Sequence, residues 1–455
     1  MSVYQQFIED KVKQGVAPGF VGTVFDRNGV VWSGAAGHHT VPGSEAAPEG
    51  KKMSTETVHW MASASKISIS IIVLALLDKG LVSGWSLDDL DNHEKLIKVL
   101  PEFKVGSGSL VSKIIEGYGP VGADGKREMK LRDAKSEVTL RHLLTHSAGM
   151  AYYTWGAFML IVFAPCMTTK WNHPHMVEYY QPSEGEAHGI LAFVSGRIAD
   201  FEVPRVREAG EEHCYQPVTD WLGQFATRAS GKNLPTLFRE LILTPLGLTE
   251  SEMAIQNSKI IKAGKDISGF HVRGPGGDQG PDFINIPLPV YQCATDDPPE
   301  GQAHFASAAI YTTVPTYSNF LRACLNHDSK LLSEKAWKLG EEDPWNGKVA
   351  MPYPYYKTGR PDLTYDIDEF APSTATGKGY CVSLLQQNLA TAPTKSGRPA
   401  GSYAWAGLGN SYYFVDPITG IGSLISTQVL PFADPKLMQL KDEWEQLVYQ
   451  QQAKK

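Results

Sequence analysis

The chain has 455 residues, of which 42% are hydrophobic and 20% charged, and its net charge is −7. This composition is typical of a globular protein with one large domain or two lobes, and the lack of a basic run argues against a nucleic-acid partner. The longest apolar runs have eight residues, too few to cross a membrane, while a polar N-terminus and five scattered cysteines without a C-x-x-C pair predict reduced thiols and a cytoplasmic location.

The first 80 residues predict two helices with a β-hairpin between them. After an N-terminal helix, two β-rich runs in residues 19–37 flank the turn Arg27-Asn28-Gly29. The second helix is predicted from about residue 63 to Lys79, because its apolar residues follow helical spacing and Gly80 is a suitable C-cap.

The rest of the chain predicts further helices, a long loop and a return to strands. Helices are expected from 139, over 220–230 and over 234–243, and residues 265–300, rich in Gly, Pro and Asp, predict a loop. Two strands around a Pro-Gly turn then precede a C-terminal helix at 435–451.

Strands at both chain ends predict an α/β (α+β) protein in which the terminal strands share one antiparallel sheet. We expect residues 1–60 and 300–455 to form the sheet domain. Residues 61–299 should form a mainly helical lobe, with insertions at 151–205 and 265–300, and the two parts one catalytic unit.

Residues 61–70, MASASKISIS, place four serines around Lys66. A serine hydroxyl is a weak nucleophile until a base takes its proton. Ser63 and Lys66 have the i, i+3 spacing of one helix face, and at a helix start the unpaired N–H groups favour negative charge. Ser70 also lies within reach, but in mid-helix. The alternative is a capped core helix with a solvated lysine, because Lys66 becomes a base only where burial or positive charge lowers its pKa.

Segments along nearly the whole chain resemble the serine β-lactamase-fold hydrolases, the class C β-lactamase-like esterases and transesterases, which carry an S-x-x-K motif. Within this group CYQPVTDWLGQ (214–224) resembles the fungal lovastatin-type acyltransferases, with Asp220-Trp221 five residues after Tyr215. The other resembling segments are DRNGVVWSGAAG (26–37), TVHWMASASKISISIIVLALLDKGLV (57–82), LPEF (100–103), VTLRHLLTHSAGM (138–150), LILTPLGLTESEM (241–253), SAAIYTTVPTYSNFLRACL (307–325) and AWAGLGNSYYFVDP (404–417).

The resemblance implies catalytic roles for three residues. Ser63 would be the acylated nucleophile and Lys66 its base or proton partner. Tyr215 would be the second base, with a phenol pKa lowered by a nearby Lys66 ammonium.

The resemblance also implies an oxyanion hole and a substrate-binding strand. Residues 405–407 would stand where β-lactamases have Lys-Thr-Gly, so that Trp405 and Gly407 bind substrate and the N–H of Leu408 pairs with that of Ser63. Trp405 in place of the lysine, and Gln216 and Pro217 after the tyrosine, make a β-lactamase unexpected. Literal Lys-Thr-Gly at 357–359 and Lys-Ser-Gly at 395–397 are interpreted as coincidences, and AHFASAAIYTT (303–313) lacks the expected glycines.

Together these features predict a serine acyltransferase or esterase that passes an acyl group from a (thio)ester donor to an alcohol of a fungal secondary metabolite, or to water. An acyl carrier protein of a polyketide synthase is a possible donor, and no cofactor or metal is expected. The alternatives are a simple carboxylesterase or lactone hydrolase, and a relative of the same fold that either catalyses a reaction other than acyl transfer or binds a ligand without catalysis.

The aromatic segment 151–205 and the histidines near 142–146 each allow a structural and a functional interpretation. The aromatic segment 151–205 forms either a lobe core or a pocket wall in which Tyr153 and Trp155 bind substrate. His142 and His146 have metal-pair spacing, but without H-E-x-x-H they favour helix packing and a turn contact.

Overall fold

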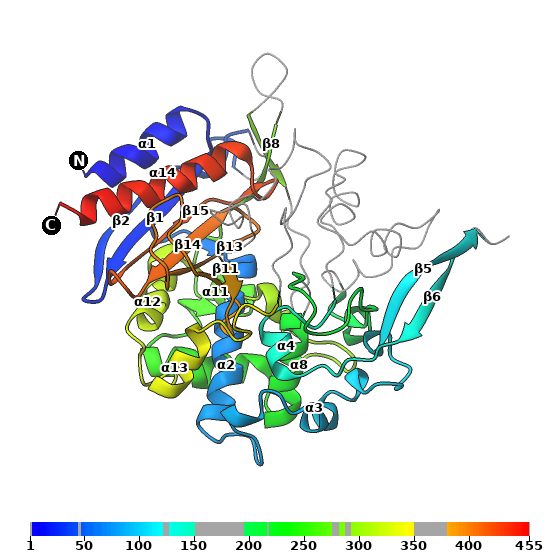
Figure 1. The fold of residues 1–455 in the computed structure, drawn as a ribbon. Coiled ribbons are helices and arrows are strands. Elements are labelled where there is room, and N and C mark those ends of the chain that lie inside the picture. The colour runs from blue at the N-terminus through cyan, green and yellow to red at the C-terminus, as the bar shows by residue number, and fades with distance from the viewer. Residues whose placement is uncertain are drawn as a thin grey trace.

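The fold is built on an eight-stranded antiparallel sheet in the order β11-β12-β13-β14-β15-β1-β2-β3 (Figure 1). The computed structural model describes residues 2–43, 47–121, 127–150, 195–215, 218–274, 282–286, 293–349 and 380–454. The strands of the sheet are β1 (Gly19–Asp26), β2 (Val30–Thr40), β3 (Lys51–Lys52), β11 (Tyr380–Val382), β12 (Asn388–Ala390), β13 (Tyr403–Gly407), β14 (Ser411–Asp416) and β15 (Ile421–Ser426).

The two ends of the chain meet in this sheet, as predicted. Strand β1 pairs with β15 from Val21↔Ser426 to Asp26↔Ile421, and with β2 on its other side. The Asp26 carboxylate accepts the N–H groups of Asn28 and Gly29, at 2.8 and 3.1 Å, which closes the predicted hairpin turn. The predicted α/β (α+β) architecture, with an antiparallel sheet built from both ends of the chain, is therefore confirmed.

Helices cover both faces of the sheet (Figure 1). On one face α1 (Val3–Lys13) and α14 (Pro435–Gln452) bury Tyr4 and Trp444 against Trp32 of β2. On the other face α12 (Val314–Leu325) packs on β1 and β15, and beyond it lies α2 (Lys66–Asp78).

The central helix α2 is buried along its length from Lys66 to Leu77, which explains why its sequence is apolar on every side. The predicted helix start at 63 is instead a 3₁₀ turn, η1 (Ala62–Ser65), that runs into α2. The remaining helices are α3 (His93–Val99), α4 (Leu140–Leu144), α8 (Val218–Ser230), α9 (Leu234–Phe238), α10 (Thr244–Leu246), α11 (Asn257–Lys262), α13 (Glu334–Glu341), the π-helix η6 (Arg239–Leu243) and the 3₁₀ turns η2 (Leu87–Asp89), η3 (Pro101–Phe103), η4 (Leu110–Ser112), η5 (Ile198–Phe201) and η8 (Ala306–Ala308).

The prediction of one long loop over 265–300 is wrong for part of that range. Strands β8 (Phe270–Arg273) and β9 (Phe283–Ile286) pair with each other, and β8 also pairs with β16 (Val429–Leu430) near the chain's other end. Each of these strands has only four residues or fewer, so the surrounding Gly and Pro dominate the sequence pattern. These strands gain their stability from pairing, and for β8 one partner, β16, is distant in sequence.

Two further small sheets complete the described fold. The strands β4 (Val58–Trp60), β10 (Tyr311–Thr313) and β7 (Met253–Ala254) form one, and β4 leads directly into η1. The hairpin of β5 (Lys113–Val121) and β6 (Arg127–Asp133), which sequence patterns did not predict, projects from the body (Figure 1). In the described ranges, every helix is too short or too polar to span a bilayer.

Candidate active site

The segment that joins β4 to α2 presents Ser63 from a strained backbone. Its start is fixed by two hydrogen bonds, from Trp60 Nε1 to Ala308 O at 2.6 Å and from Met61 N to Ile310 O at 2.8 Å. Ala62 then adopts a φ of +48°, a left-handed conformation that costs a residue with a Cβ about 1 kcal/mol or more. Such strain is common where a side chain must be held in an exposed, reactive position.

The structure distinguishes among the four serines of MASASKISIS. Ser65 Oγ accepts the N–H of Ile310 at 3.0 Å, and Ser68 Oγ donates to the Ser65 carbonyl at 2.7 Å. Ser70 is completely buried within α2, whereas Ser63 is partly exposed. Only Ser63 among them therefore combines access for a substrate with a contact to Lys66.

Ser63, Lys66 and Tyr215, predicted from sequence to act together, lie close together, and Ser63 Oγ is within hydrogen-bonding distance of the other two. Lys66 Nζ donates to Ser63 Oγ at 3.2 Å, and Tyr215 Oη donates to the same oxygen at 2.9 Å. Lys66 Nζ also donates to the Ser307 carbonyl at 2.9 Å and lies 5.1 Å from the centre of the Tyr215 ring. The serine oxygen is thus flanked by an amine and a phenol.

Burial makes Lys66 a candidate base. Its side chain is 1% exposed, and desolvation lowers the pKa of its ammonium to about 7, against the opposing charge of Asp220. An appreciable fraction of Lys66 is therefore the neutral amine near neutral pH, the form that can accept a proton.

The expectation that Lys66 lowers the pKa of Tyr215 is wrong. Burial raises the pKa of the phenol well above its ordinary value, and the hydrogen bonds from its surroundings offset only part of that effect. The physical reason is that an amine and a phenol respond to desolvation in opposite directions. Tyr215 therefore keeps its proton at neutral pH and can donate it.

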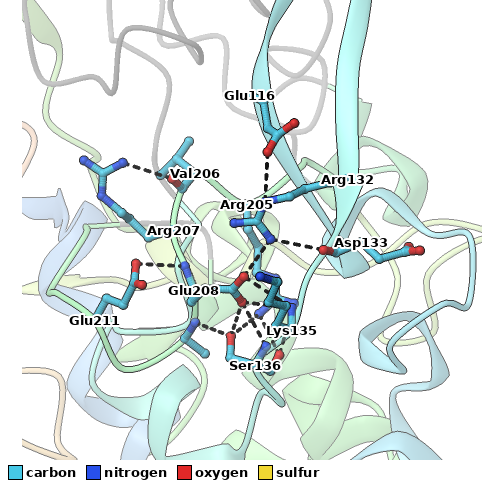
Figure 2. A network of polar contacts seen from close by, with 11 residues as sticks. Glu116, Arg132, Asp133, Lys135, Ser136, Arg205, Val206, Arg207, Glu208 and Glu211 are labelled. Carbon is cyan, nitrogen blue, oxygen red and sulfur yellow. Dashed lines mark hydrogen bonds and ion pairs between the residues drawn. The ribbon is translucent and has the colours of Figure 1, made fainter.

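A polar network anchors the segment that leads to Tyr215 (Figure 2). The Glu208 carboxylate accepts from Arg132 at 2.7 Å, from Ser136 N at 2.8 Å and from Lys135 N at 3.0 Å. Burial would raise the Glu208 pKa, but these hydrogen bonds outweigh it and bring the pKa to about 2. The network joins the end of β6 to residues 205–209, six residues before the tyrosine.

The side chain of Tyr215 packs against the rings of His146 and Trp405. Its ring lies 5.0 Å from that of His146 and 5.4 Å from that of Trp405, centre to centre, and His146 stacks on Trp405 with an interplanar angle of 8°. His146 follows α4, Trp405 belongs to β13, and each comes from a different part of the chain. Tyr215 is therefore clamped between the helical region and the sheet.

The end of β13 lies directly against the nucleophile segment. A Cβ placed on Gly407 would lie 2.3 Å from the Met61 carbonyl oxygen, so only glycine permits this approach. Leu408 follows at the turn and is buried. Sequence resemblance predicted Trp405, Gly407 and Leu408 for the site; the first two lie at the end of β13 beside η1, and Leu408 is the first residue of the turn that follows.

Some predicted features lie elsewhere or outside the described residues. Tyr153, Trp155 and the literal Lys-Thr-Gly at 357–359 lie outside the described residues. In the Lys-Ser-Gly at 395–397, Ser396 donates to Glu445 of α14, so this loop packs on the C-terminal helix.

The histidines that could have formed a metal pair have other contacts. His142 Nδ1 accepts the N–H of Thr139 at 3.1 Å and so caps α4, and its ring stacks on Trp345. In the described ranges, His, Cys, Asp and Glu never gather in threes suitable for a metal ion.

Three residues at the site were not assigned roles from sequence. They are Asp220, which is buried beside Lys66, Ser307, which accepts from Lys66, and His146, which packs on Tyr215. The Tyr-x₄-Asp spacing in the sequence could have pointed to Asp220. The segment AHFASAAIYTT gave no sign of Ser307, because Ser307 contacts Lys66 and Asp220 through its main chain.

The chain is similar to curated fungal acyltransferases and to a fungal esterase. Monacolin J acid methylbutanoyltransferase of Aspergillus terreus is 24% identical over 86% of this chain and 81% of its own, and ML-236A carboxylate methylbutanoyltransferase of Penicillium citrinum is 24% identical over 88% and 82%. Lovastatin esterase of Penicillium rubens is 24% identical over 71% and 69%. The sequence-based expectation of an acyltransferase or esterase accords with these relatives.

Solved structures show the same fold over nearly the full length. Simvastatin synthase of Aspergillus terreus superposes with a TM-score of 0.72 at 22% identity, covering 98% of this chain and 97% of that one. EstCE1, described as a hydrolase with promiscuous acyltransferase activity, gives 0.61 at 16% identity, with 97% of both chains covered. The Beta-lactamase family profile matches residues 4–443, and the chain belongs to that family.

Proposed function

We propose that this protein is a serine acyltransferase or esterase that works through an acyl-Ser63 intermediate. The observation that carries the proposal is the position of Ser63 Oγ, 3.2 Å from Lys66 Nζ and 2.9 Å from Tyr215 Oη. A nucleophile beside an amine with a pKa near 7 and a phenol that keeps its proton has the groups that two-step acyl transfer needs.

In the first step Ser63 Oγ attacks the carbonyl carbon of an ester or thioester, and its proton passes to the neutral amine of Lys66. The π electrons of the carbonyl move onto its oxygen, which gives a tetrahedral oxyanion. When the oxyanion collapses, the bond to the leaving thiolate or alkoxide breaks. The leaving group takes the phenol proton of Tyr215, and the Lys66 ammonium restores that proton.

In the second step an alcohol or a water molecule attacks the acyl-serine. Its proton passes through Tyr215 and Lys66 in the reverse direction, and Ser63 leaves as the protonated hydroxyl. Transfer and hydrolysis therefore use the same residues and differ only in the molecule that reaches the acyl-enzyme.

The main-chain N–H groups of Ser63 and Leu408 would stabilise the oxyanion in both steps. The support for this role is the contact between Gly407 and Met61 O, which brings the end of β13 to the nucleophile segment. Each preorganised donor of this kind lowers the activation barrier by about 3 kcal/mol.

The relatives suggest the substrate class. Two are named methylbutanoyltransferases of monacolin J acid and of ML-236A carboxylate, and one is named lovastatin esterase. We therefore assign to this chain a short acyl donor and an alcohol acceptor from fungal secondary metabolism. Trp405 would form an apolar wall where a lysine would hold a carboxylate, which favours an ester over a β-lactam. A carrier-protein thioester remains a candidate donor, and the four described cysteines are free thiols, as suits a cytoplasmic enzyme.

Intact-protein mass spectrometry after mixing with a short-chain acyl thioester tests the proposal. Wild type should gain one acyl mass on the peptide that contains Ser63, and Ser63→Ala should gain none. Ser70→Ala, the same substitution at a buried serine of α2, should be labelled like wild type. If Ser63→Ala is labelled to the same extent as wild type, the nucleophile is assigned wrongly.

The partition of the acyl-enzyme between an added alcohol and water then separates transferase from esterase. Consumption of a lactone, but not of linear esters or thioesters, would favour the lactone hydrolase. If neither esters nor thioesters are consumed and no protein is labelled, the proposed function fails.

A further inference from the structure

Asp220 is a buried carboxylate that the reaction scheme above does not use. It lies in the first turn of α8, is 3% exposed, and accepts the N–H of Ser307 through Oδ1 at 3.1 Å. Its second oxygen, Oδ2, is also buried, and hydrogen bonds from Ser307 and Ala306 offset only part of the effect of burial, which raises the pKa of the carboxyl. Such a group is costly to bury unless a nearby positive charge compensates it.

Ser307 links this carboxylate to the candidate base. Its N–H donates to Asp220, while its carbonyl accepts from Lys66 Nζ at 2.9 Å, so the main chain of one residue is held from both sides. The approach of α8 to η8 is unusually close, since a Cβ on Gly223 would lie 2.8 Å from the Cβ of Ala306. Gly223 follows Asp220 by three residues and so lies on the same face of α8.

We propose that Asp220 is a positioning residue for the acyl-transfer reaction. Through Ser307 it fixes the carbonyl that orients Lys66 toward Ser63, and its carboxylate stabilises the ammonium that Lys66 becomes when it takes the serine proton. The inference rests on the proposed function, in which Lys66 is the proton acceptor.

The charges around the pair support this role. Asp220 raises the pKa of Lys66 against the larger effect of burial, and burial in turn raises the pKa of Asp220 itself. Tyr215, whose ring centre lies 5.1 Å from Lys66 Nζ, is neutral at pH 7 because burial raises its pKa. On the side of Tyr215 away from the pair, its ring contacts His146, which in turn contacts His213, whose pKa burial lowers to about 3.

Asp220→Asn is the informative variant, because an amide oxygen can still accept the Ser307 N–H while the charge is lost. The rate of Ser63 acylation by a thioester is measured from pH 5 to 9 by mass spectrometry. Without the carboxylate the Lys66 ammonium is less stable, so the acid limb of the profile should move at least about one pH unit lower. The plateau rate should fall about tenfold or more, since a less basic amine is a weaker general base.

Asp416→Asn is the matched control, since Asp416 is also a fully buried carboxylate but lies at the far end of β14 from the site. Its acid limb should coincide with that of wild type, even if it melts at a lower temperature. A folded Asp220→Asn protein that acylates with the wild-type pH profile would overturn the inference. Loss of acylation in wild type itself would instead overturn the proposed function.

A second measurement does not depend on the stability of Asp220→Asn. In Lys66→Met the positive partner is lost, so by reciprocity the Asp220 carboxyl should hold its proton to a higher pH. Infrared titration of ¹³C-aspartate-labelled protein follows the protonated carboxyl band directly. A band that titrates at the same pH in wild type and Lys66→Met would show that the two groups do not interact.

Discussion

Gly407→Ala should slow acylation far more than it destabilises the fold. The added Cβ would lie 2.3 Å from Met61 O and 3.2 Å from Met61 C, both main-chain atoms that cannot rotate away. Met61 is fixed by its N–H bond to Ile310 O, and Gly407 by its pairing with Ser411 of β14. One of the two backbones must therefore move.

The size of the movement follows from the contact distance. Real Cβ contacts are essentially never under 3.0 Å, so the two segments must separate by at least 0.7 Å, which is 3.0 minus 2.3. This shift would move the Leu408 N–H away from the oxyanion position set by Ser63. Loss of one such donor lowers kcat about 100- to 1,000-fold, whereas overpacking costs about 1–3 kcal/mol of folding stability.

The assay is single-turnover acylation of Ser63, followed by mass spectrometry, beside a thermal melt of each protein. Gly29→Ala is the matched control, since a Cβ at that hairpin glycine meets no atom within 4 Å. It should acylate at the wild-type rate. A folded Gly407→Ala protein that also acylates at the wild-type rate would refute the link between this contact and the oxyanion hole.

Two further outcomes follow from the burial of titratable groups. Tyr215→Phe should lower the rate of Ser63 acylation about 100-fold or more with an alkyl ester, because the alkoxide leaving group needs a proton. The loss should be much smaller with a nitrophenyl ester, whose leaving group needs none. Equal losses for both esters would contradict the role of Tyr215 as proton donor. His59 and His213 have pKa values of about 3 in the fold. Because unfolded histidine has a pKa of about 6.5, the unfolded state takes up protons first as the pH falls, and each histidine should cost roughly 1.4 kcal/mol of stability per pH unit below about 6.5. Urea unfolding at pH 7 and pH 5 measures this loss, and equal stability at the two values would contradict it.

The parts of the fold that sequence predicted are those with local signals. The hairpin around Asn28 and the central helix after Ser63 each carry their pattern within about 20 residues. Strands β8 and β9 were missed because each has only four residues and gains its stability from pairing with each other and with β16. The prediction of a loop there followed composition, which does not report partners distant in sequence.

The residues of the candidate site also separate into those with a local sequence signal and those without one. The spacing of Ser63 and Lys66 is a local property, so their contact could be predicted, and Tyr215 was identified through resemblance. The role of Ser307 could not be predicted, because it acts through its main-chain N–H and carbonyl, which every residue carries. Asp220 could be recognised as part of a motif, but its burial beside Lys66 depends on how closely α8 approaches η8.

The error over Tyr215 shows how the site works. An ammonium beside a phenol would lower the phenol's pKa, but the same burial that surrounds Tyr215 also surrounds Lys66 and drives the amine toward its neutral form. One desolvated environment therefore lowers the pKa of the amine and raises that of the phenol. It leaves Ser63 between a group that can take a proton and a group that can give one, near neutral pH and without an ion pair between them. Among the described residues, Asp220 is the group that opposes this effect on Lys66. Its charge therefore sets how far the amine's pKa falls, and a change at Asp220 should alter the pH dependence of the enzyme before it alters the fold.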